Sequence, residues 1–512
     1  MEEVKGNLLQ AASGKRVFEA FPYNTYEILA PSFTESERKL AKLFIDVILR
    51  RISLTSLSTG LQSERALVEE FRSKVVQLVD VNELVSKLPS TVLFSEILGN
   101  FEAIAKQLGV SSPKQFASYV LNHSIGYREL SELMQDPDLE EIMVNGFDRN
   151  VFVTHRKFGN CKTGIVATER GFLQQLISRI AATVNKQFNE SHPLLDARLP
   201  DGSRANATFS YATPFGHTLT IRKFTKVPLS IVNLIENNTL SSKVAAFLWC
   251  MVEGLGLYPM NLIVTGGAGS GKTTFMNVLA VFIPFKERII TIEDTVELDL
   301  AGRMNWIQME SKPKIRDLQE ISMDDLLKNS LRMRPDRILV GEVRGREAQT
   351  LFVAMDTGHR GILGTLHSNT AREMMLRLKS PPMSVEEQML PLLDLAVVMQ
   401  RTFEKSKGVV RRVKQVSEIA RMDEKVLLSN VFEYNDKSGR IGKTDVPSHV
   451  IETLAEKCGL SKNELKREML VREKLLEWMI ARGITLNSEV ETIVQQYYFN
   501  PEGVLQILTA ET

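Results

Sequence analysis

The spacing of apolar residues changes several times along the chain and divides it into segments of different predicted secondary structure. Apolar residues recur every three or four positions, the period of an amphipathic helix, in residues 36–51, 61–79, 81–87, 93–108 and 113–123. This period predicts a helical subdomain over residues 36–125. Residues 1–35 contain Pro22 and Pro31 and keep no sustained period, so we expect an irregular N-terminal arm there.

Residues 126–227 mix the two periods and predict a small α/β domain. The expected elements are a turn, a short helix and a strand over 136–146, strands at 151–154 and 219–224, and a helix at 171–186. The pair Asp201-Gly202 is typical of a tight turn. Pro228 and the polar residues that begin at Asn233 indicate a linker, which we place at 228–233 as a hinge.

Residues 234–446 alternate between apolar runs of strand length and amphipathic helices. Strands are expected at 261–265, 288–292, 337–342, 361–367 and 395–399, with helices at 274–280 and 324–334. Strands alternating with helices indicate a parallel sheet, and such sheets bind ligands at the carboxyl ends of their strands. Residues 447–512 return to helical spacing and predict a helical C-terminal tail.

One glycine-rich segment carries a recognisable chemistry. The run Gly266-Gly-Ala-Gly-Ser-Gly271-Lys272-Thr273 matches the phosphate-binding pattern G-x-x-x-x-G-K-[ST] and falls between a predicted strand and a predicted helix. Backbone N–H groups of such a loop surround a polyphosphate at the positive end of a helix. Lys272 is expected to reach the β- and γ-phosphates of ATP, and Thr273 to ligate Mg²⁺. The expected nucleotide-binding residues are Gly266, Gly267, Ala268, Gly269, Ser270, Gly271, Lys272, Thr273 and Thr274.

Acidic residues and one histidine end the other predicted strands. Glu342 closes the apolar run 338–341, where an ATPase carries the acid that serves Mg²⁺ and the attacking water, although Gly341 stands where an aspartate is common. Glu293 ends another strand and is expected to join Glu342 as catalytic and metal-binding groups. Asp294 and Glu297 either complete this cluster or are solvated surface acids. His367 either senses the γ-phosphate or has a structural role.

Arginines can stabilise the negative charge that develops during phosphoryl transfer. Arg204 and Arg222, with Arg198 behind them, are the candidates, although the residues alone favour an ordinary surface arginine at each position. The basic stretch at 401–407 and the pair Arg411-Arg412 are typical of a solvated hairpin.

Composition restricts the class of partner and the compartment. The 512 residues carry a formal net charge of only +1, and no basic groove interleaved with aromatics is evident, so we expect no nucleic-acid partner. The three cysteines form no C-x-x-C pair, which favours reduced thiols and excludes a zinc module of four cysteines. The first residues lack a signal peptide and no run of 18 apolar residues occurs, so we expect a cytoplasmic protein with at most a peripheral membrane role.

Four motifs together resemble the ATPases of the type II/IV secretion superfamily, over residues 126–425. The glycine-rich loop resembles their Walker A motif, residues 292–297 resemble their acidic box, residues 331–345 their atypical Walker B motif ending in Gly-Glu, and residues 357–369 their histidine box. The segments 136–146, 201–204 and 220–224 are similar to the N-terminal domain of that superfamily, whose arginines reach the nucleotide. That part of the resemblance carries over to Arg204 and Arg222. The missing tetracysteine module argues against the type II secretion and pilus-extension branch. The long helical N-terminal part and the helical tail make the chain most like the archaeal flagellum, or archaellum, ATPase.

The resemblance implies a RecA-like ATPase domain with a parallel-rich sheet, preceded by the helical and α/β segments and followed by the helical tail. It implies a homohexamer that hydrolyses Mg-ATP and pushes on a polytopic membrane platform protein, with other cytoplasmic motor components. The first 30 or so residues, irregular and mildly amphipathic, are the candidates for lipid contact. The product would be a type IV pilus-like surface filament. The alternatives are an archaeal adhesive-pilus or secretion ATPase, a nucleic-acid motor, and a scaffold gated by nucleotide binding alone.

Overall fold

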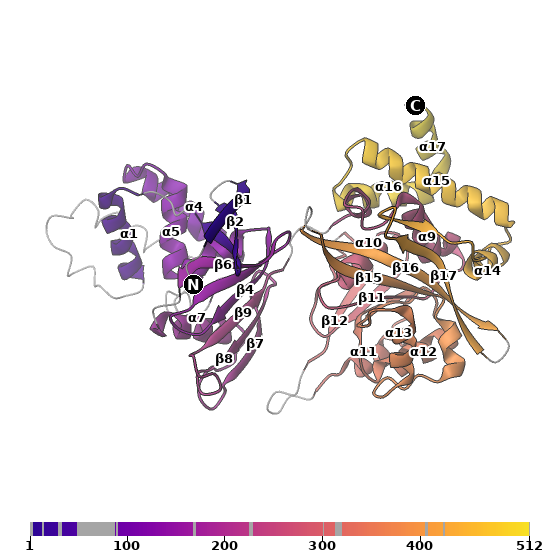
Figure 1. The fold of residues 1–512 in the computed structure, drawn as a ribbon, viewed down its shortest axis with the longest axis horizontal. Coiled ribbons are helices and arrows are strands. Elements are labelled where there is room, and N and C mark those ends of the chain that lie inside the picture. The colour runs from indigo at the N-terminus through magenta and orange to yellow at the C-terminus, as the bar shows by residue number, and fades with distance from the viewer. Residues whose placement is uncertain are drawn as a thin grey trace. The chain divides into compact units, whose positions relative to one another are not determined.

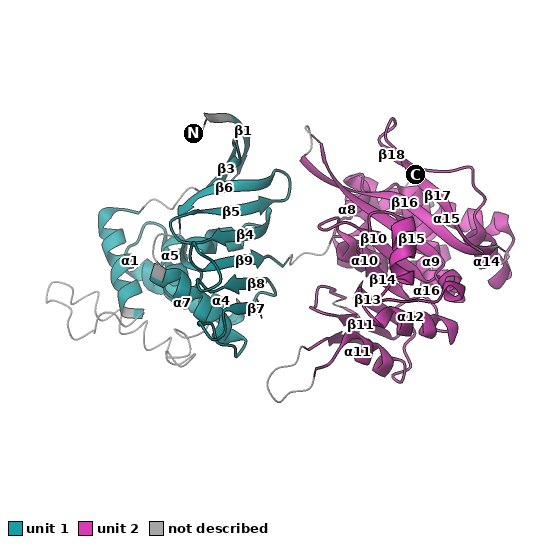
Figure 2. Ribbon diagram, turned by 60° about the horizontal axis from the view of Figure 1, so that its bottom comes forward, with its two compact units in different colours: residues 1–225 teal, residues 226–512 magenta. Residues whose placement is uncertain are grey.

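The structure is a computed structural model, and it describes residues 4–12, 15–28, 33–48, 88, 91–166, 170–224, 229–300, 302–312, 320–404, 408–422 and 425–510. The chain divides into two compact units, Met1–Thr225 and Lys226–Thr512, coloured separately in Figure 2. The helices expected at 61–79 and 81–87 lie outside the described residues. Each unit is built on its own nine-stranded sheet.

The sheet of the first unit has the strand order β1-β2-β3-β6-β5-β4-β9-β8-β7. All neighbouring strands are antiparallel except β3 and β6. The strands are β1 Val4–Ala12, β2 Lys15–Phe21, β3 Asn24–Ile28, β4 Leu139–Asn145, β5 Asn150–His155, β6 Gly159–Val166, β7 Leu194–Arg198, β8 Arg204–Thr208 and β9 Thr218–Arg222. The helices are α1 Glu35–Ile48, α4 Thr91–Gln107, α5 Pro113–Ser124, η3 Arg128–Leu130, α6 Ser131–Gln135 and α7 Arg170–Thr183.

The prediction of an irregular arm over residues 1–35 is wrong where the structure describes that segment. Three strands lie there, and Pro22 occupies the bend between β2 and β3, where its missing N–H costs no ladder hydrogen bond. Val17 and Tyr26 are buried in the core of this unit, and the Lys15 ammonium donates to the Asp138 carboxylate at 2.9 Å. Strands β1, β2 and β3 pair with one another in order, and β3 joins them to β6, far along the chain. Local periodicity gave no sign of that distant pairing.

One helix of the first unit also lies elsewhere than expected. The short helix anticipated within 136–146 is α6, which ends at Gln135, and a turn then leads into β4 at Leu139. The expected strands at 151–154 and 219–224 and the helix at 171–186 correspond to β5, β9 and α7. Helices α1, α4 and α5 pack around Phe44, Phe101 and Phe116 as a separate hydrophobic cluster.

The second unit is a sheet covered by helices on both faces (Figure 1). Its strand order is β12-β11-β13-β14-β10-β15-β16-β17-β18, parallel from β12 to β15 and antiparallel from β15 to β18. The strands are β10 Leu262–Gly266, β11 Ile289–Glu293, β12 Trp306–Glu310, β13 Arg337–Val343, β14 Leu363–Leu366, β15 Leu395–Glu404, β16 Gly408–Met422, β17 Lys425–Asn435 and β18 Arg440–Lys443. The α/β class and the parallel-rich sheet are therefore as expected.

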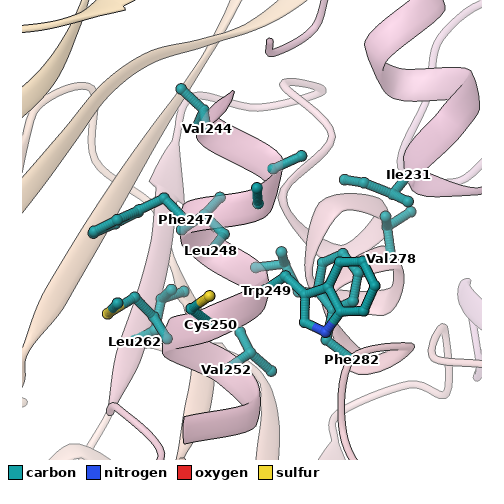
Figure 3. Packing of buried hydrophobic residues seen from close by; sticks show 14 of the residues in the cluster. Ile231, Val244, Phe247, Leu248, Trp249, Cys250, Val252, Leu262, Val278 and Phe282 are labelled. Atoms are coloured by element: carbon teal, nitrogen blue, oxygen red, sulfur yellow. The ribbon is translucent and has the colours of Figure 1, made fainter. Parts of the chain in front are cut away.

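Two hydrophobic clusters lie on opposite faces of this sheet. One face packs against α8 Ile231–Glu236, α9 Ser242–Glu253 and α10 Lys272–Ala280. Trp249 and Phe282, labelled in Figure 3, stack in that cluster. Their ring centroids are 5.1 Å apart. The other face packs against α11 Met323–Ser330, α12 Glu347–Asp356, α13 Ala371–Lys379 and the turn η5 Glu387–Leu392. The turn η4 Gly254–Gly256 follows α9. Successive residues of β10, such as Ile263 and Val264, enter opposite clusters, as expected for a strand buried on both faces.

Polar residues interpreted as linker in fact begin a helix. The expected hinge at 228–233 overlaps α8, because Ser230 and Asn233 form a capping box in which each side chain accepts a hydrogen bond from the other's backbone N–H. Similarly, Ser241 caps α9 rather than extending a linker. The boundary between the two compact units lies between residues 225 and 226.

The helical segment after residue 447 is confirmed and belongs to the core of the second unit. It consists of α14 His449–Lys457, α15 Lys462–Ala481, α16 Asn487–Phe499 and α17 Pro501–Ala510. Leu475, Leu476 and Val494 share a cluster with α9 and α10. Buried Arg472 donates to the Glu253 carboxylate of α9 at 3.0 Å. These helices therefore complete one face of the sheet.

Candidate active site at the carboxyl edge of the parallel sheet

The glycine-rich loop joins the carboxyl end of β10 to the first residue of α10. Gly269 and Gly271 have φ angles of +67° and +87°, in the left-handed region that side chains rarely adopt. A Cβ atom on Gly266 would lie 2.5 Å from the carbonyl oxygen of Met399 on β15. These backbone demands explain glycine at three positions and leave the N–H groups of the first turn of α10 directed at the loop, as an anion site requires.

Lys272 and Ser270 both reach back across this loop. Lys272 Nζ donates to the carbonyl oxygen of Gly267 at 3.2 Å, and Ser270 Oγ donates to the same oxygen at 2.8 Å. The ammonium group therefore lies over the loop backbone, beside the N-terminus of α10. Thr273 is half-buried and Thr274 is exposed.

Glu293 ends β11 and is 2% exposed. Its Oε1 accepts hydrogen bonds from the N–H groups of Glu297 and Leu298, at 2.8 and 3.0 Å. Its Cγ atom fills the space beside Gly341 on the neighbouring strand β13, 2.8 Å from where a Cβ atom would be. The Glu293 side chain thus fills the space beside β13 that a side chain at position 341 would need. Many ATPases carry an aspartate at the equivalent position.

Glu342 and His367 lie on the next two strands. Glu342 follows Gly341 in β13 and is half-buried, and His367 directly follows β14 and is also half-buried. Thr365 Oγ1 donates to the Gly341 carbonyl at 2.5 Å and links the two strands at this level. Since β11, β13, β14 and β10 are adjacent and parallel, Glu293, Glu342, His367 and the glycine-rich loop meet at one edge of the sheet.

Asp294 has partners of its own. Its carboxylate forms an ion pair with Arg344 and accepts a hydrogen bond from Ser311 Oγ at 2.9 Å. Glu297 contributes its backbone N–H to Glu293, as described above. Within the described parts of the chain, no group of three or more His, Cys, Asp or Glu side chains could by itself hold a metal ion.

The three candidate arginines form one row across the open face of the first sheet. Arg198 on β7 lies opposite Arg204 on β8, and Arg204 lies opposite Arg222 on β9. Ala197, Ala205 and Ile221, the neighbours that alternate with them, are buried in the core on the α7 side. The row therefore lies on the face away from that core, with Glu141 of β4 next to Arg222.

Three residues near the loop were not singled out from the sequence. Thr265 and Ser368 share a hydrogen bond between their hydroxyls, 2.7 Å long, that ties the end of β14 to β10. Asn369 Oδ1 lies 3.0 Å from the position of a Cβ on Gly267. Both Ser368 and Asn369 fall inside the histidine-box segment, and this motif is the sequence feature that could have identified them. Arg411, assigned to a solvated hairpin, instead donates from Nε to the Gly269 carbonyl at 2.9 Å.

The residues at this edge fit a magnesium nucleotide. The loop supplies backbone donors and Lys272 a cation for phosphate groups, while Thr273 offers a hydroxyl and Glu293 and Glu342 offer carboxylates. Protein sites usually hold Mg²⁺ through one or two carboxylates together with phosphate oxygens and water, so a cage of three protein acids is not needed.

Comparison with known families agrees with this architecture. The profile of the family described as type II/IV secretion system protein matches residues 128–498. MJ0900, an uncharacterized protein of Methanocaldococcus jannaschii, is 30% identical over 481 residues, which cover 92% of this chain and 85% of that protein. MJ0781 of the same organism is 44% identical over 313 residues, which cover 56% of this chain and 42%, less than half, of that relative.

More distant similarities extend to conjugation proteins and to a solved structure. The conjugal transfer protein TrbB of Rhizobium radiobacter is 28% identical over 307 residues, 58% of this chain and 89% of TrbB. The X-ray structure of the Legionella pneumophila ATPase DotB aligns with a TM-score of 0.40 and 18% identity, over 74% of this chain and 94% of DotB.

Proposed function

The chain belongs to the family of type II/IV secretion system proteins, and from this premise we propose that it hydrolyses ATP with Mg²⁺ as a homohexameric motor. One observation carries the proposal. The glycine-rich loop, Glu293, Glu342 and His367 come from four adjacent parallel strands and meet at a single edge of the sheet. Phosphoryl transfer needs this combination of phosphate binding, metal ligation and water orientation.

Each residue at the edge has a distinct role in this proposal. The loop N–H groups and Lys272 bind the phosphates of ATP and neutralise their charge. Thr273, Glu342 and Glu293 are the groups that would hold Mg²⁺, which supplies further positive charge to the phosphate oxygens. Glu342 orients the attacking water, and His367 contacts the γ-phosphate.

The row of arginines supplies the charge that the transition state requires. Arg204 and Arg222 engage the phosphates, from the same subunit or a neighbouring one, when ATP closes the two units. Hydrolysis then weakens this closure. Arg204 and Arg222 lie directly opposite each other on β8 and β9, so their side chains share one face of the sheet, where a single anion can contact both.

The mechanical output is the assembly, and possible rotation, of a type IV pilus-like surface filament such as the archaellum. In this proposal the hexamer is cytoplasmic, lies peripherally on the membrane and acts with other motor components on a polytopic platform protein, with some lipid contact. Among the described helices, none combines the length and the apolar character needed to span a bilayer.

Two other outputs share the same chemistry. Similarity to TrbB, whose name refers to conjugal transfer, favours a secretion machine as the alternative, and an adhesive pilus is a further possibility. A nucleic-acid motor is disfavoured by the formal net charge of +1. ATPase activity that rises with added DNA, in a salt-dependent manner, would bring the nucleic-acid motor back.

Steady-state ATPase activity tests the proposal. The wild type, Lys272→Ala and Glu342→Gln are compared with and without anionic lipid vesicles. We expect both variants to lose about 100-fold or more in rate, because each loses a group that stabilises the transition state. The wild type should respond to vesicles. Activity that survives Lys272→Ala would overturn the proposal.

Two further measurements separate the motor from a nucleotide-gated scaffold. A nonhydrolysable ATP analogue should shift the size of the protein in solution from smaller species to a hexamer, and a protein that stays monomeric at micromolar concentration in every nucleotide state contradicts the ring. If Glu342→Gln traps ATP and still supports filament assembly, turnover is not needed and the scaffold is the better description.

A further inference from the structure

The β15–β16 hairpin brings a pair of arginines to the glycine-rich loop. We propose that Arg401 and Arg411 bind the phosphate chain of the nucleotide in cis, from the β15 side of the loop. Glu342 and His367 approach from its other side, since β14 and β15 flank β10. This inference rests on the proposed ATPase function and assigns further phosphate-binding residues to it.

The strand pattern explains why Arg401 reaches this place. Leu395, Val397 and Met399 alternate along β15 and are buried in the cluster that contains α10. Met399 is paired with Gly266, the last residue of β10, so β15 continues where the β10 chain turns into the loop. The next residue on the same face is Arg401, and it lies at the level of the loop rather than of the core.

Strand β16 repeats this arrangement. Val413 lies opposite Met399 and is buried in the same cluster, and Arg411 lies opposite Arg401. Residues directly opposite in an antiparallel pair share a face. A buried apolar stripe that crosses both strands therefore ends in two arginines beside the glycine-rich loop.

The contacts of these arginines fall on the loop glycines. Arg411 Nε donates to the Gly269 carbonyl at 2.9 Å, and Arg411 Cδ lies 3.4 Å from the position of a Cβ on Gly271. Arg401 Nη1 lies 3.2 Å from the position of a Cβ on Gly269. Both side chains thus touch the segment whose backbone N–H groups surround phosphates in loops of this pattern.

Electrostatics distinguishes this pair from an ordinary surface hairpin. Like charges directly opposite on neighbouring strands destabilise a sheet. The nearby acid Glu404 is paired with Arg412, whose guanidinium lies 5.0 Å from the centre of the Tyr434 ring. In the part of the chain that the structure describes, Arg401 has no carboxylate partner. A polyphosphate beside both guanidinium groups would accept charge-assisted hydrogen bonds from them.

Equilibrium binding of a fluorescent ADP analogue, with ATP as competitor, tests the assignment on the full chain. The variants are Arg401→Ala/Arg411→Ala, the charge-conserving Arg401→Lys/Arg411→Lys, and Arg440→Ala on exposed β18 as the matched control. At low salt we expect the alanine pair to lower the affinity for both the ADP analogue and ATP by about 10- to 100-fold, because hydrogen bonds between charged groups are lost. The lysine pair should lose less affinity than the alanine pair, because it keeps both charges but not the fixed fork of guanidinium donors. Arg440→Ala should match the wild type.

Salt dependence distinguishes phosphate binding from bracing of the loop through the Gly269 carbonyl. If the arginines bind phosphate, the difference between wild type and the alanine pair shrinks as KCl rises from about 50 to 500 mM, because salt screens the attraction. A difference that stays constant with salt, or wild-type affinity in the alanine pair, overturns the inference. The proposed function fails separately: a wild type that binds no nucleotide, or binds it equally well after Lys272→Ala, overturns both.

Discussion

The Cγ atom of Glu293 lies 2.8 Å from the position that a Cβ atom would take at Gly341. Glycine at 341 is therefore the residue that lets the acid of β11 pack against β13, directly before Glu342. The two carboxylates therefore come from two strands, β11 and β13. In many ATPases they come from consecutive positions of one strand. The Gly-Glu ending of β13 and the glutamate that ends β11 are then parts of one arrangement.

Gly341→Ala should displace Glu293 and slow turnover. The added methyl group meets the Cβ and Cγ atoms of Glu293, so the strand or the acid must shift. A misplacement of this size costs about 10- to 100-fold in rate, while the affinity for ATP should change little because the loop is untouched. Steady-state kinetics and nucleotide binding measure the two effects.

Gly442→Ala is the control for that substitution, because a Cβ at position 442 has no atom within 4 Å. It should keep the wild-type rate. A wild-type rate in Gly341→Ala would show that the position of Glu293 does not matter for turnover.

The double variant Arg204→Gln/Arg222→Gln should lose hydrolysis and keep nucleotide binding at the loop. Arginines that stabilise the transition state contribute about 10³-fold or more, and both residues lie in the unit that does not carry the loop. The measurement pairs ATPase rate with equilibrium binding of an ATP analogue. Lys157→Ala, in an exposed turn of the same unit, is the control, and unchanged turnover in the double variant would remove both arginines from the mechanism.

Arg472→Met should lower the free energy of unfolding of the second unit by about 3–5 kcal/mol, because it leaves a buried carboxylate without its partner. Arg472 Nη2 and Nε donate to Glu253 and Glu468, each at 3.0 Å. Urea unfolding followed by tryptophan fluorescence, to which Trp249 beside Arg472 contributes, reports the change. Adding Glu253→Gln should restore part of the loss, and exposed Lys474→Met should have a small effect. Additive losses would mean that the pair does not couple α15 to α9.

Asp394 should make stability depend on pH in the acidic range. Burial, which Arg360 and the Asn261 N–H only partly offset, raises the pKa of Asp394 from 3.8 to about 6. The folded state therefore holds this proton more tightly than the unfolded state. As the pH rises from about 4 through 6, ionisation of Asp394 costs the folded state stability, and above that window the loss is complete.

The comparison of wild type with Asp394→Asn isolates this effect. The free energy of unfolding of the wild type, relative to the variant, should fall between about pH 4 and pH 6 and then level off. His449 also acts on Asp394 and is present in both proteins. Asp445→Asn, at an exposed position, is the charge-matched control. A wild-type advantage that grows with pH would contradict the raised pKa.

The sequence by itself determined the elements that depend on neighbours in the chain. Local spacing predicts the glycine-rich loop, the buried strands β10, β11, β13, β14 and β15, and the helices after residue 447. A strand buried on both faces is a continuous apolar run, and a helix buried on one face has a periodic apolar pattern. The motifs also named Glu293, Glu342 and His367 as ends of separate strands. Their meeting at one edge could be expected from the parallel class of the sheet.

Only the tertiary structure decided what depends on distant pairing. Strands β1–β3 pair with one another in order, but they join the rest of the unit through β6 and through contacts such as Lys15 with Asp138, 123 residues away. The alignment of Arg198, Arg204 and Arg222 and the pairing of Arg401 with Arg411 are matters of strand register, which single-strand periodicity leaves open. The packing of Glu293 on Gly341 likewise requires two strands in register. Local sequence records which face of an element is buried, whereas the partner that covers it is chosen by the fold as a whole.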